Sequence, residues 1–232
     1  MRGIPKSSKH LPQSVWIEEY NFQTFYRSPV IHHSARCPVK RLLDILLALV
    51  GLSLTGILIV PITIAMYLDN PGSLFYSQIR CGLKGKKFRM WKFRSMVVGA
   101  EKMKHLVENQ AKGHIFKNDQ DPRVTRVGRF LRKTSLDEFP QFWNVLKGEM
   151  SIVGTRPPTL DEVVHYEEHH WQRLNVKPGI TGEWQANGRS SIDNFEEIVR
   201  LDLLYQQKWS VFYDLVLIAK TIGSVLNRKG AC

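Results

Sequence analysis

Hydrophobic residues form one long uninterrupted run near the start of the chain. From Ile45 to Leu68, 24 residues contain no Lys, Arg, Asp, Glu or His. As a helix this run would be about 36 Å long, enough to reach across a bilayer core of about 30 Å. It begins after 44 residues, and no A-x-A cleavage site follows it, unlike a signal peptide. The pattern therefore predicts a permanent membrane element.

The residues on either side of the run bear on how it meets the membrane. Both flanks are basic, with Arg27, Arg36, Lys40 and Arg41 before the run and Arg80, Lys84, Lys86, Lys87, Arg89, Lys92 and Arg94 after it. Basic flanks prefer the cytoplasm, and both obey that preference only if the helix enters and leaves on the same face. Pro61 breaks one backbone hydrogen bond and can supply a bend, with Ser53 and Thr55 close enough to accommodate it. A single-pass anchor and a re-entrant helix in one leaflet both remain open.

After the run, the polar and apolar positions alternate as in short strands. Residues 73–79 alternate well enough for a strand, and residues 82–85 form a turn. Residues 87–93 then alternate cationic and apolar side chains, which predicts a hairpin with one basic face. We expect an α+β fold, mainly α, with a re-entrant membrane helix, amphipathic interfacial helices and a short β-hairpin.

The rest of the chain favours helices and one long loop. A polar helix is expected at 100–112, a mixed charged helix at 160–173, a Gly- and Pro-rich loop at 176–188 and helix again at 194–226. Asp121-Pro122 opens a basic amphipathic helix at 123–133 whose apolar side is expected to be Val124, Val127, Phe130 and Leu131. We divide the chain into an N-terminal extension (1–38), a re-entrant membrane helix (39–69) and a cytoplasmic catalytic domain (70–232).

Composition narrows the class of partner. The 232 residues carry 33 Lys and Arg against 21 Asp and Glu, a formal net charge of +12. Such an excess indicates a polyanionic partner, which can be nucleic acid, an anionic membrane surface or a phosphorylated substrate. Three widely spaced cysteines without a C-x-x-C pair exclude a disulfide framework, give no zinc signature and favour a reducing, cytoplasmic setting.

Three histidines, His165, His169 and His170, lie within the helix expected at 160–173. The spacing of His165 and His169 suits a pair of metal ligands, but there is no H-E-x-x-H pattern. A solvated helix face is the favoured interpretation.

The most suggestive chemistry lies in Ser135-Leu136-Asp137-Glu138, which follows the basic helix. One interpretation is a capping box, with Ser135 at the N-cap and Glu138 three residues later, although Pro140 would kink such a helix. In the other, basic neighbours keep Asp137 ionised as a nucleophile toward phosphorus, and the second carboxylate holds Mg²⁺. Four guanidinium groups suit bidentate phosphate contacts, those of Arg94, Arg132, Arg156 and Arg189. There is no Walker A loop and no G-x-G-x-x-G.

Several motifs in order resemble the bacterial sugar transferase family, the monotopic phosphoglycosyl transferases that begin glycoconjugate pathways. The similarity covers roughly residues 38–226. The motifs are K-R-x-x-D from Lys40, G-S-L-F-x-x-Q-x-R-x-G from Gly72, K-F-R-S-M from Lys92, D-P-R-V-T-R-x-G-x-x-L-R from Asp121, S-L-D-E from Ser135, N-V-L-K-G-x-M-S from Asn144, R-P from Arg156 and K-P-G-I-T-G from Lys177.

The resemblance implies a re-entrant helix at the cytoplasmic face of the bacterial inner (plasma) membrane. It also implies transfer of a sugar phosphate from a UDP-sugar to undecaprenyl phosphate, with release of UMP. Asp137 would form a covalent phosphosugar intermediate, and the dyad of Asp137 and Glu138 would hold Mg²⁺.

The resemblance assigns roles to further residues. Basic positions expected around the diphosphate and nucleotide are matched by Lys92, Arg132, Arg156 and Arg189. Asp202 and Asp214 match acidic positions of the C-terminal helices, and a structural salt bridge is the favoured role for each. The sugar and the oligomeric state stay open, a homo-oligomer included. A different class of protein, a membrane-anchored basic module that binds an anionic polymer without catalysis, would also explain the charge and the apolar run.

Overall fold

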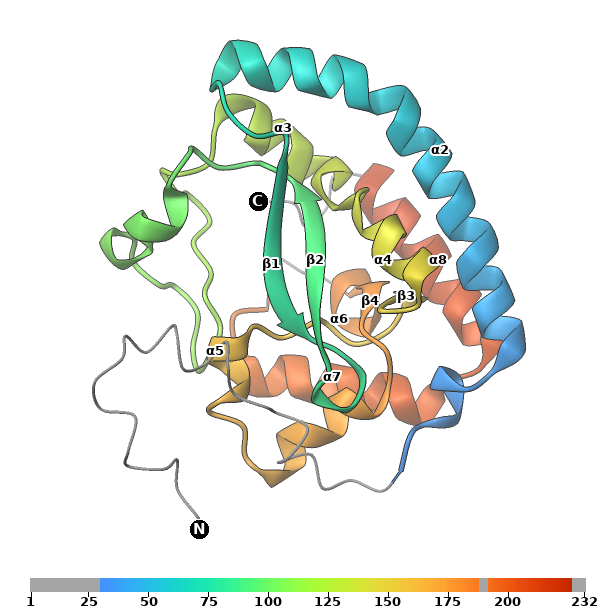
Figure 1. Cartoon of the computed structure of the whole chain (residues 1–232). Coiled ribbons are helices and arrows are strands. Elements are labelled where there is room, and N and C mark those ends of the chain that lie inside the picture. Colours follow the sequence, from blue (N-terminus) through green and yellow to red (C-terminus); the bar gives the residue numbers. More distant parts are fainter. Residues whose placement is uncertain (1–29, 188–191, 227–232) are drawn as a thin grey trace.

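The computed structural model describes residues 30–187 and 192–226, and its largest element is one long apolar helix. Helix α2 (Pro38–Asp69) begins with Pro38 in its first turn, where a missing N–H costs nothing, and ends before Asn70. Figure 1 shows α2 as an arc that passes along one side of the rest of the molecule and over the open end of the β-hairpin, where β1 starts and β2 ends. The helix predicted from the apolar run is confirmed. Among the described residues, α2 alone is long and apolar enough to cross a membrane.

Helix α2 has two different faces. Seven residues spaced three, four or seven apart are buried against the rest of the chain: Lys40, Asp44, Ala48, Gly51, Thr55, Ile62 and Met66. The opposite face exposes large apolar side chains along its whole length, among them Leu42, Leu46, Leu49, Ile57, Ile64 and Leu68. An exposed apolar surface of this extent is typical of a membrane or partner interface.

The helix continues through Pro61 without a break. The hydroxyl of Ser53 donates to Leu49 O and that of Thr55 donates to Gly51 O, each four residues back. Because Pro61 has no backbone N–H, the carbonyl of Ile57 lacks its usual helical donor. Neither hydroxyl donates to this carbonyl. The expectation that these two hydroxyls support a bend at Pro61 is therefore wrong.

The predicted hairpin is confirmed. Strands β1 (Phe75–Cys81) and β2 (Lys87–Phe93) pair antiparallel, from Phe75 opposite Phe93 to Cys81 opposite Lys87. Helix α4 (Gln141–Lys147) covers the outer edge of β2, where the Asn144 side-chain amide accepts from Trp91 N and donates to Arg89 O. Phe88 and Met90 of β2 then enter the main core with Val145 of α4.

A second, smaller sheet was not predicted. Strand β3 (Ser151–Val153) pairs parallel with β4 (Gly179–Thr181), and α6 (Glu183–Ala186) follows. The segment 176–188 is therefore not one long loop over its described residues. Strands of three residues, buried on both faces, carry too few positions to show an alternating pattern.

The helices differ in detail from the prediction. Helix α3 (Arg126–Lys133) starts later than expected, because the hydroxyl of Thr125 accepts from Gly128 N and caps the helix there. Asp121 does not open it, since this carboxylate pairs with Arg123 at 2.6 Å. Phe130 is exposed rather than turned inward.

The other predicted helices are shorter or divided. Residues 100–112 contain a 3₁₀ helix at Ala100–Leu106, and 160–173 divides into α5 (Leu160–Val163) and a 3₁₀ helix at Glu168–Asn175. The C-terminal region forms α7 (Phe195–Lys208) and α8 (Val211–Leu226). Of the N-terminal extension, residues 1–29 lie outside the described residues, and His33–Ala35 is a 3₁₀ turn.

Candidate active site

The paired acids lie on a tight turn between α3 and α4. Ser135 has a left-handed backbone (φ 55°), and Leu136–Glu138 is a single 3₁₀ turn. The Ser135 side chain makes no cap hydrogen bond, so the capping box is not formed. A left-handed conformation at a non-glycine residue costs about 1–2 kcal/mol and is a feature of functional sites. The turn fixes both carboxylates next to the C-terminus of the basic helix.

Lys92 reaches the dyad from the end of β2. Its ammonium nitrogen lies 2.9 Å from Glu138 Oε1. Asp137 is almost fully buried, whereas the side chains of Lys92 and Glu138 keep a small exposed area. A cation at hydrogen-bond distance favours the ionised form of a carboxylate. The structure thus brings together three of the residues that the sequence singled out.

Arg132 lies in the last turn of α3, three residues before Ser135. Its Nε donates to the Ser95 hydroxyl at 2.9 Å. The backbone carbonyl of Ser95 accepts from Thr125 N and lies so close to Gly128 that no β-carbon would fit there. Helix α3 is thereby packed onto the segment that follows Lys92. Ser95 belongs to the K-F-R-S-M motif, but nothing in the sequence indicates this contact with Arg132.

Arg94 is committed to structure at the end of α2. Its guanidinium donates to the side-chain and main-chain oxygens of Asn70, both at 2.6 Å, and to Ser73 O at 2.7 Å. These bonds join the end of α2 to the strand that carries Lys92. All of these hydrogen-bond partners of Arg94 lie outside the dyad.

Arg156 belongs to a second basic cluster. The cluster comprises Arg80, Arg156, Arg173, Glu162 and Asp202, three guanidinium groups and two carboxylates. Arg156 pairs with Glu162 through both terminal nitrogens, at 2.7 and 3.0 Å, and Arg173 pairs with Asp202 at 2.7 Å. Burial, together with the charge of Arg156, lowers the pKa of Arg80 to about 10. The salt bridge expected for Asp202 is confirmed, and Glu162 was missed. Arg189 lies outside the described residues.

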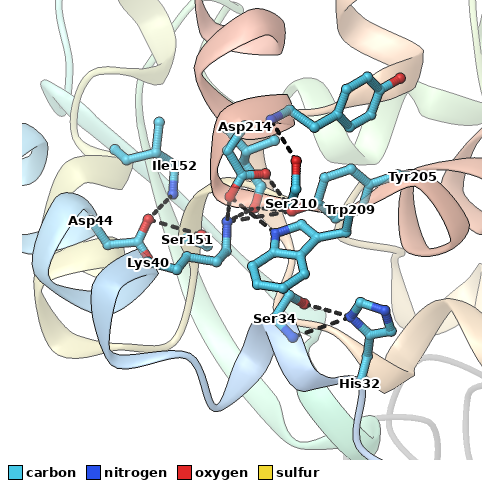
Figure 2. Close-up of polar contacts among 12 residues, drawn as sticks. His32, Ser34, Lys40, Asp44, Ser151, Ile152, Tyr205, Trp209, Ser210 and Asp214 are labelled. Carbon is cyan, nitrogen blue, oxygen red and sulfur yellow. Dashed lines mark hydrogen bonds and ion pairs between the residues drawn. The ribbon is translucent and has the colours of Figure 1, made fainter.

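A buried polar network holds the start of α2 (Figure 2). Lys40 Nζ lies 2.6 Å from Asp214 Oδ2 of α8 and donates to Val153 O, while Tyr205 donates to the other oxygen of Asp214. Asp44 accepts from the Ser151 hydroxyl and from a backbone N–H, each at 2.9 Å. The salt bridge expected for Asp214 is confirmed.

The far end of α2 is bonded to the same body of protein. Asp69 Oδ2 accepts from Val127 N of α3 at 2.8 Å. Ile62 and Met66 pack with Phe93 and Leu131 in one apolar cluster. Both ends of α2 therefore contact the part of the chain that carries the dyad.

The histidines form a hydrogen-bonded group rather than one solvated face. His169, His170 and Glu196 bring ligand atoms within 4.8 Å of one another. His170 Nδ1 accepts from Glu167 N, so its Nε2 carries the proton and donates to Glu196 at 2.8 Å. Both ring nitrogens of the buried His170 are thus satisfied without a metal. His165 and His169 are exposed, as predicted.

Comparison with known proteins decides the family. A model of bacterial sugar transferases matches residues 35–228, most of the chain. The chain belongs to the bacterial sugar transferase family. It is 47% identical over 223 residues to the galactosyl transferase CpsE of Streptococcus agalactiae, an alignment that covers 93% of this chain and 49% of CpsE.

Other bacterial sugar transferases match at similar identity. The UDP-glucose:undecaprenyl-phosphate glucose-1-phosphate transferase of Escherichia coli is 43% identical over 200 residues, which cover 83% of this chain and 41% of the relative. The exopolysaccharide production protein ExoY of Rhizobium meliloti is 39% identical over 198 residues, which cover 83% of this chain and 87% of ExoY. The chain thus spans about half the length of CpsE and nearly all of ExoY.

Proposed function

We propose that this sugar transferase moves a sugar phosphate from a UDP-sugar to undecaprenyl phosphate and so starts exopolysaccharide or glycoconjugate synthesis. The names of the relatives support the donor, the acceptor and the reaction class. The observation that carries the proposal is the pair of carboxylates held on a strained turn, with Lys92 at 2.9 Å from Glu138. A basic module that only binds polymer gives no reason for such a pair.

The reaction would proceed in two displacements at one phosphorus atom. First, a carboxylate oxygen of Asp137 bonds to the phosphorus that bears the sugar, the bond from that phosphorus to the bridging oxygen breaks, and UMP leaves. Second, an oxygen of undecaprenyl phosphate attacks the same phosphorus and releases the Asp137 carboxylate. The product is undecaprenyl diphosphate sugar. Lys92 and Arg132 would offset the repulsion between the carboxylate and the diphosphate.

The dyad also suits Mg²⁺. Two adjacent carboxylates supply the hard oxygen ligands that this ion prefers, so Asp137 and Glu138 would hold it. Bound there, Mg²⁺ would neutralise charge on the diphosphate. Lys92 then fixes Glu138 from the other side, which limits the orientations that its carboxylate can take.

The β-hairpin suggests how the donor lies. Tyr76 is opposite Lys92, and Arg80 is four residues farther along β1 on the same face. Four residues of strand span about 13 Å, comparable to an extended nucleotide diphosphate. We place the sugar-bearing phosphate at the dyad and the UMP end toward the basic cluster, where Arg156 and Arg80 leave a surplus of positive charge. Arg189 is proposed to bind the donor as well, as the resemblance implies.

Membrane insertion would be re-entrant. Lys40 at the start of α2 and Asp69 at its end are both bonded to the catalytic domain, which residues 70–232 are proposed to form. A helix that crossed the bilayer once would carry one of these ends about 30 Å away. With both flanks basic, the domain would lie at the cytoplasmic face of the plasma membrane.

The activity is tested by UMP release from a panel of UDP-sugars, using detergent-solubilised protein with Mg²⁺. We expect the wild type to release UMP from at least one donor and Asp137→Asn to give background only. Equal background for both proteins across the panel would favour the binding module. The panel also identifies the sugar.

Topology is tested by labelling single cysteines with a membrane-impermeant reagent. Arg36→Cys and Lys84→Cys, each in a chain whose native cysteines are replaced by serine, should react only from the cytoplasmic side. Labelling of the two positions from opposite sides would exclude the re-entrant arrangement.

A further inference from the structure

Two cations meet at the C-terminal end of α4, and among the described residues neither has a carboxylate at ion-pair distance. Arg41 donates through its two terminal nitrogens to Val145 O and Leu146 O, both at 2.7 Å. Lys177 lies in the loop before β4, and its ammonium group has no hydrogen bond or ion pair to any residue in 30–187 or 192–226.

Both cations approach the same point beside Gly148. This residue ends α4 with a left-handed backbone (φ 81°), which favours glycine. A β-carbon there would lie 3.5 Å from Arg41 Nη2 and 3.7 Å from Lys177 Nζ. A small anion near this point would be within reach of both side chains.

The surrounding charges leave this pair with a positive surplus. Lys40 is paired with Asp214, and Lys147 is paired with Glu149 at 2.6 Å. Burial lowers the pKa of Lys177, the charges of Arg41 and Lys40 lower it further, and Asp44 opposes them. A bound anion would relieve the repulsion between Lys177 and Arg41.

The position of the pair indicates which anion. Arg41 precedes Leu42 on the exposed apolar face of α2, and the exposed ring of Trp143 lies on α4. Cations at the border of an apolar membrane surface lie at headgroup level. Helix α4, about 10 Å long, separates this point from the dyad, so a phosphate held here is not the one that reacts.

We propose that Arg41 and Lys177 form a binding site for the phosphate of an anionic membrane phospholipid at the base of α2. The inference rests on the proposed membrane insertion. The lipid would fix the start of the helix at the headgroup layer, and the Lys40–Asp214 network would hold it from the protein side.

Native mass spectrometry of the full chain, released from nanodiscs of mixed POPC and POPG, tests the site. We expect the wild type to bind POPG in preference to POPC. In Lys177→Gln the ratio of bound POPG to bound POPC should fall about fivefold, which is the effect of one cation near a membrane surface. Lys177→Arg should keep the preference. Lys86→Gln, which removes an exposed charge at the hairpin turn, should also keep it. Equal preference in Lys177→Gln and wild type would overturn the proposal.

Two further experiments are needed. The first distinguishes a lipid phosphate from free phosphate, and the second distinguishes the lipid site from the proposed membrane insertion of α2. If inorganic phosphate protects Lys177 from acetylation in lipid-free detergent as fully as POPG does, the site takes free phosphate and the lipid assignment is wrong. Flotation on pure POPC vesicles reports on α2 insertion alone. Failure to float would contradict insertion, whereas flotation with no POPG preference would overturn the lipid site only.

Discussion

The carboxylate of Asp69, the last residue of α2, accepts a 2.8 Å hydrogen bond from the backbone N–H of Val127 in the first turn of α3. The end of α2 thereby caps the helix that leads to Arg132 and the dyad. We infer that the depth and tilt of α2 are coupled to the geometry of the acids through this contact. A second contact at this end of α2 is made by Arg94, which directly follows β2 and donates to the side-chain oxygen of Asn70.

Removing that cap should weaken both folding and catalysis. Asp69→Ala is expected to lower stability by about 1 kcal/mol, the usual loss for a helix cap, or about 3 °C in melting temperature. kcat for UMP release should fall with it, and Asp69→Asn, which retains an acceptor oxygen, should recover most of both. Asp119→Ala removes an exposed carboxylate as a control. A change in Asp69→Ala no larger than in the control would disprove the coupling.

The cation beside the dyad should matter for the chemical step. Lys92→Met leaves Glu138 without its 2.9 Å partner and takes one positive charge from the diphosphate. We expect kcat to fall at least tenfold, equivalent to ~1.4 kcal/mol, with partial activity in Lys92→Arg. Steady-state UMP release gives kcat and KM separately. Lys86→Met serves as the control, and unchanged kcat in Lys92→Met would remove Lys92 from the site.

Replacing only one member of the buried Lys40–Asp214 pair should strongly lower the stability of the fold. Lys40→Met leaves the buried Asp214 uncompensated, and such a loss is about 3–5 kcal/mol. Lys40→Met combined with Asp214→Leu should be more stable than Lys40→Met alone, because no isolated charge remains. Thermal melts in detergent compare the two. If the double variant is the less stable, the pair does not act as a unit.

Stability should decline as the pH falls below about 6.5 because of His170. Burial lowers the pKa of His170 from its ordinary 6.5, the neighbouring His169 adds to this, and Glu196 opposes both. The unfolded chain then binds a proton that the folded chain does not, so stability present above pH 6.5 is lost below it. The drop in melting temperature between about pH 7.5 and 5.5 should shrink in His170→Gln and persist in His105→Gln. An equal drop in both variants would exclude His170.

The sequence predicted the elements whose pattern is long or repeated. Twenty-four residues without charge specify α2, and the alternation in residues 87–93 gives β2 with the bounds observed. The dyad was found because two acids stand among basic residues. Strands β3 and β4, with three residues each, show no such pattern.

Contacts between distant residues could not be predicted from the chain. Lys40 and Asp214 lie 174 positions apart, and nothing local to Lys40 favours Asp214 over the nearer Asp44. The capping box is not formed because Ser135 adopts a left-handed backbone and its side chain makes no cap hydrogen bond. Arg94 and Arg156 were chosen for their charge, while their observed partners depend on the fold.

In the proposed mechanism, Asp137 becomes covalently attached to the sugar phosphate. The direct measurement is the intact mass of the protein after brief exposure to its UDP-sugar with Mg²⁺ and without acceptor, followed by an acid quench. We predict a mass increase of one sugar phosphate, located at Asp137 by peptide mapping, absent in Asp137→Asn and discharged by undecaprenyl phosphate. If the wild type releases UMP and forms lipid product with no adduct, the reaction does not pass through a covalent intermediate. An adduct that persists in Asp137→Asn would exclude Asp137 as the residue that carries it.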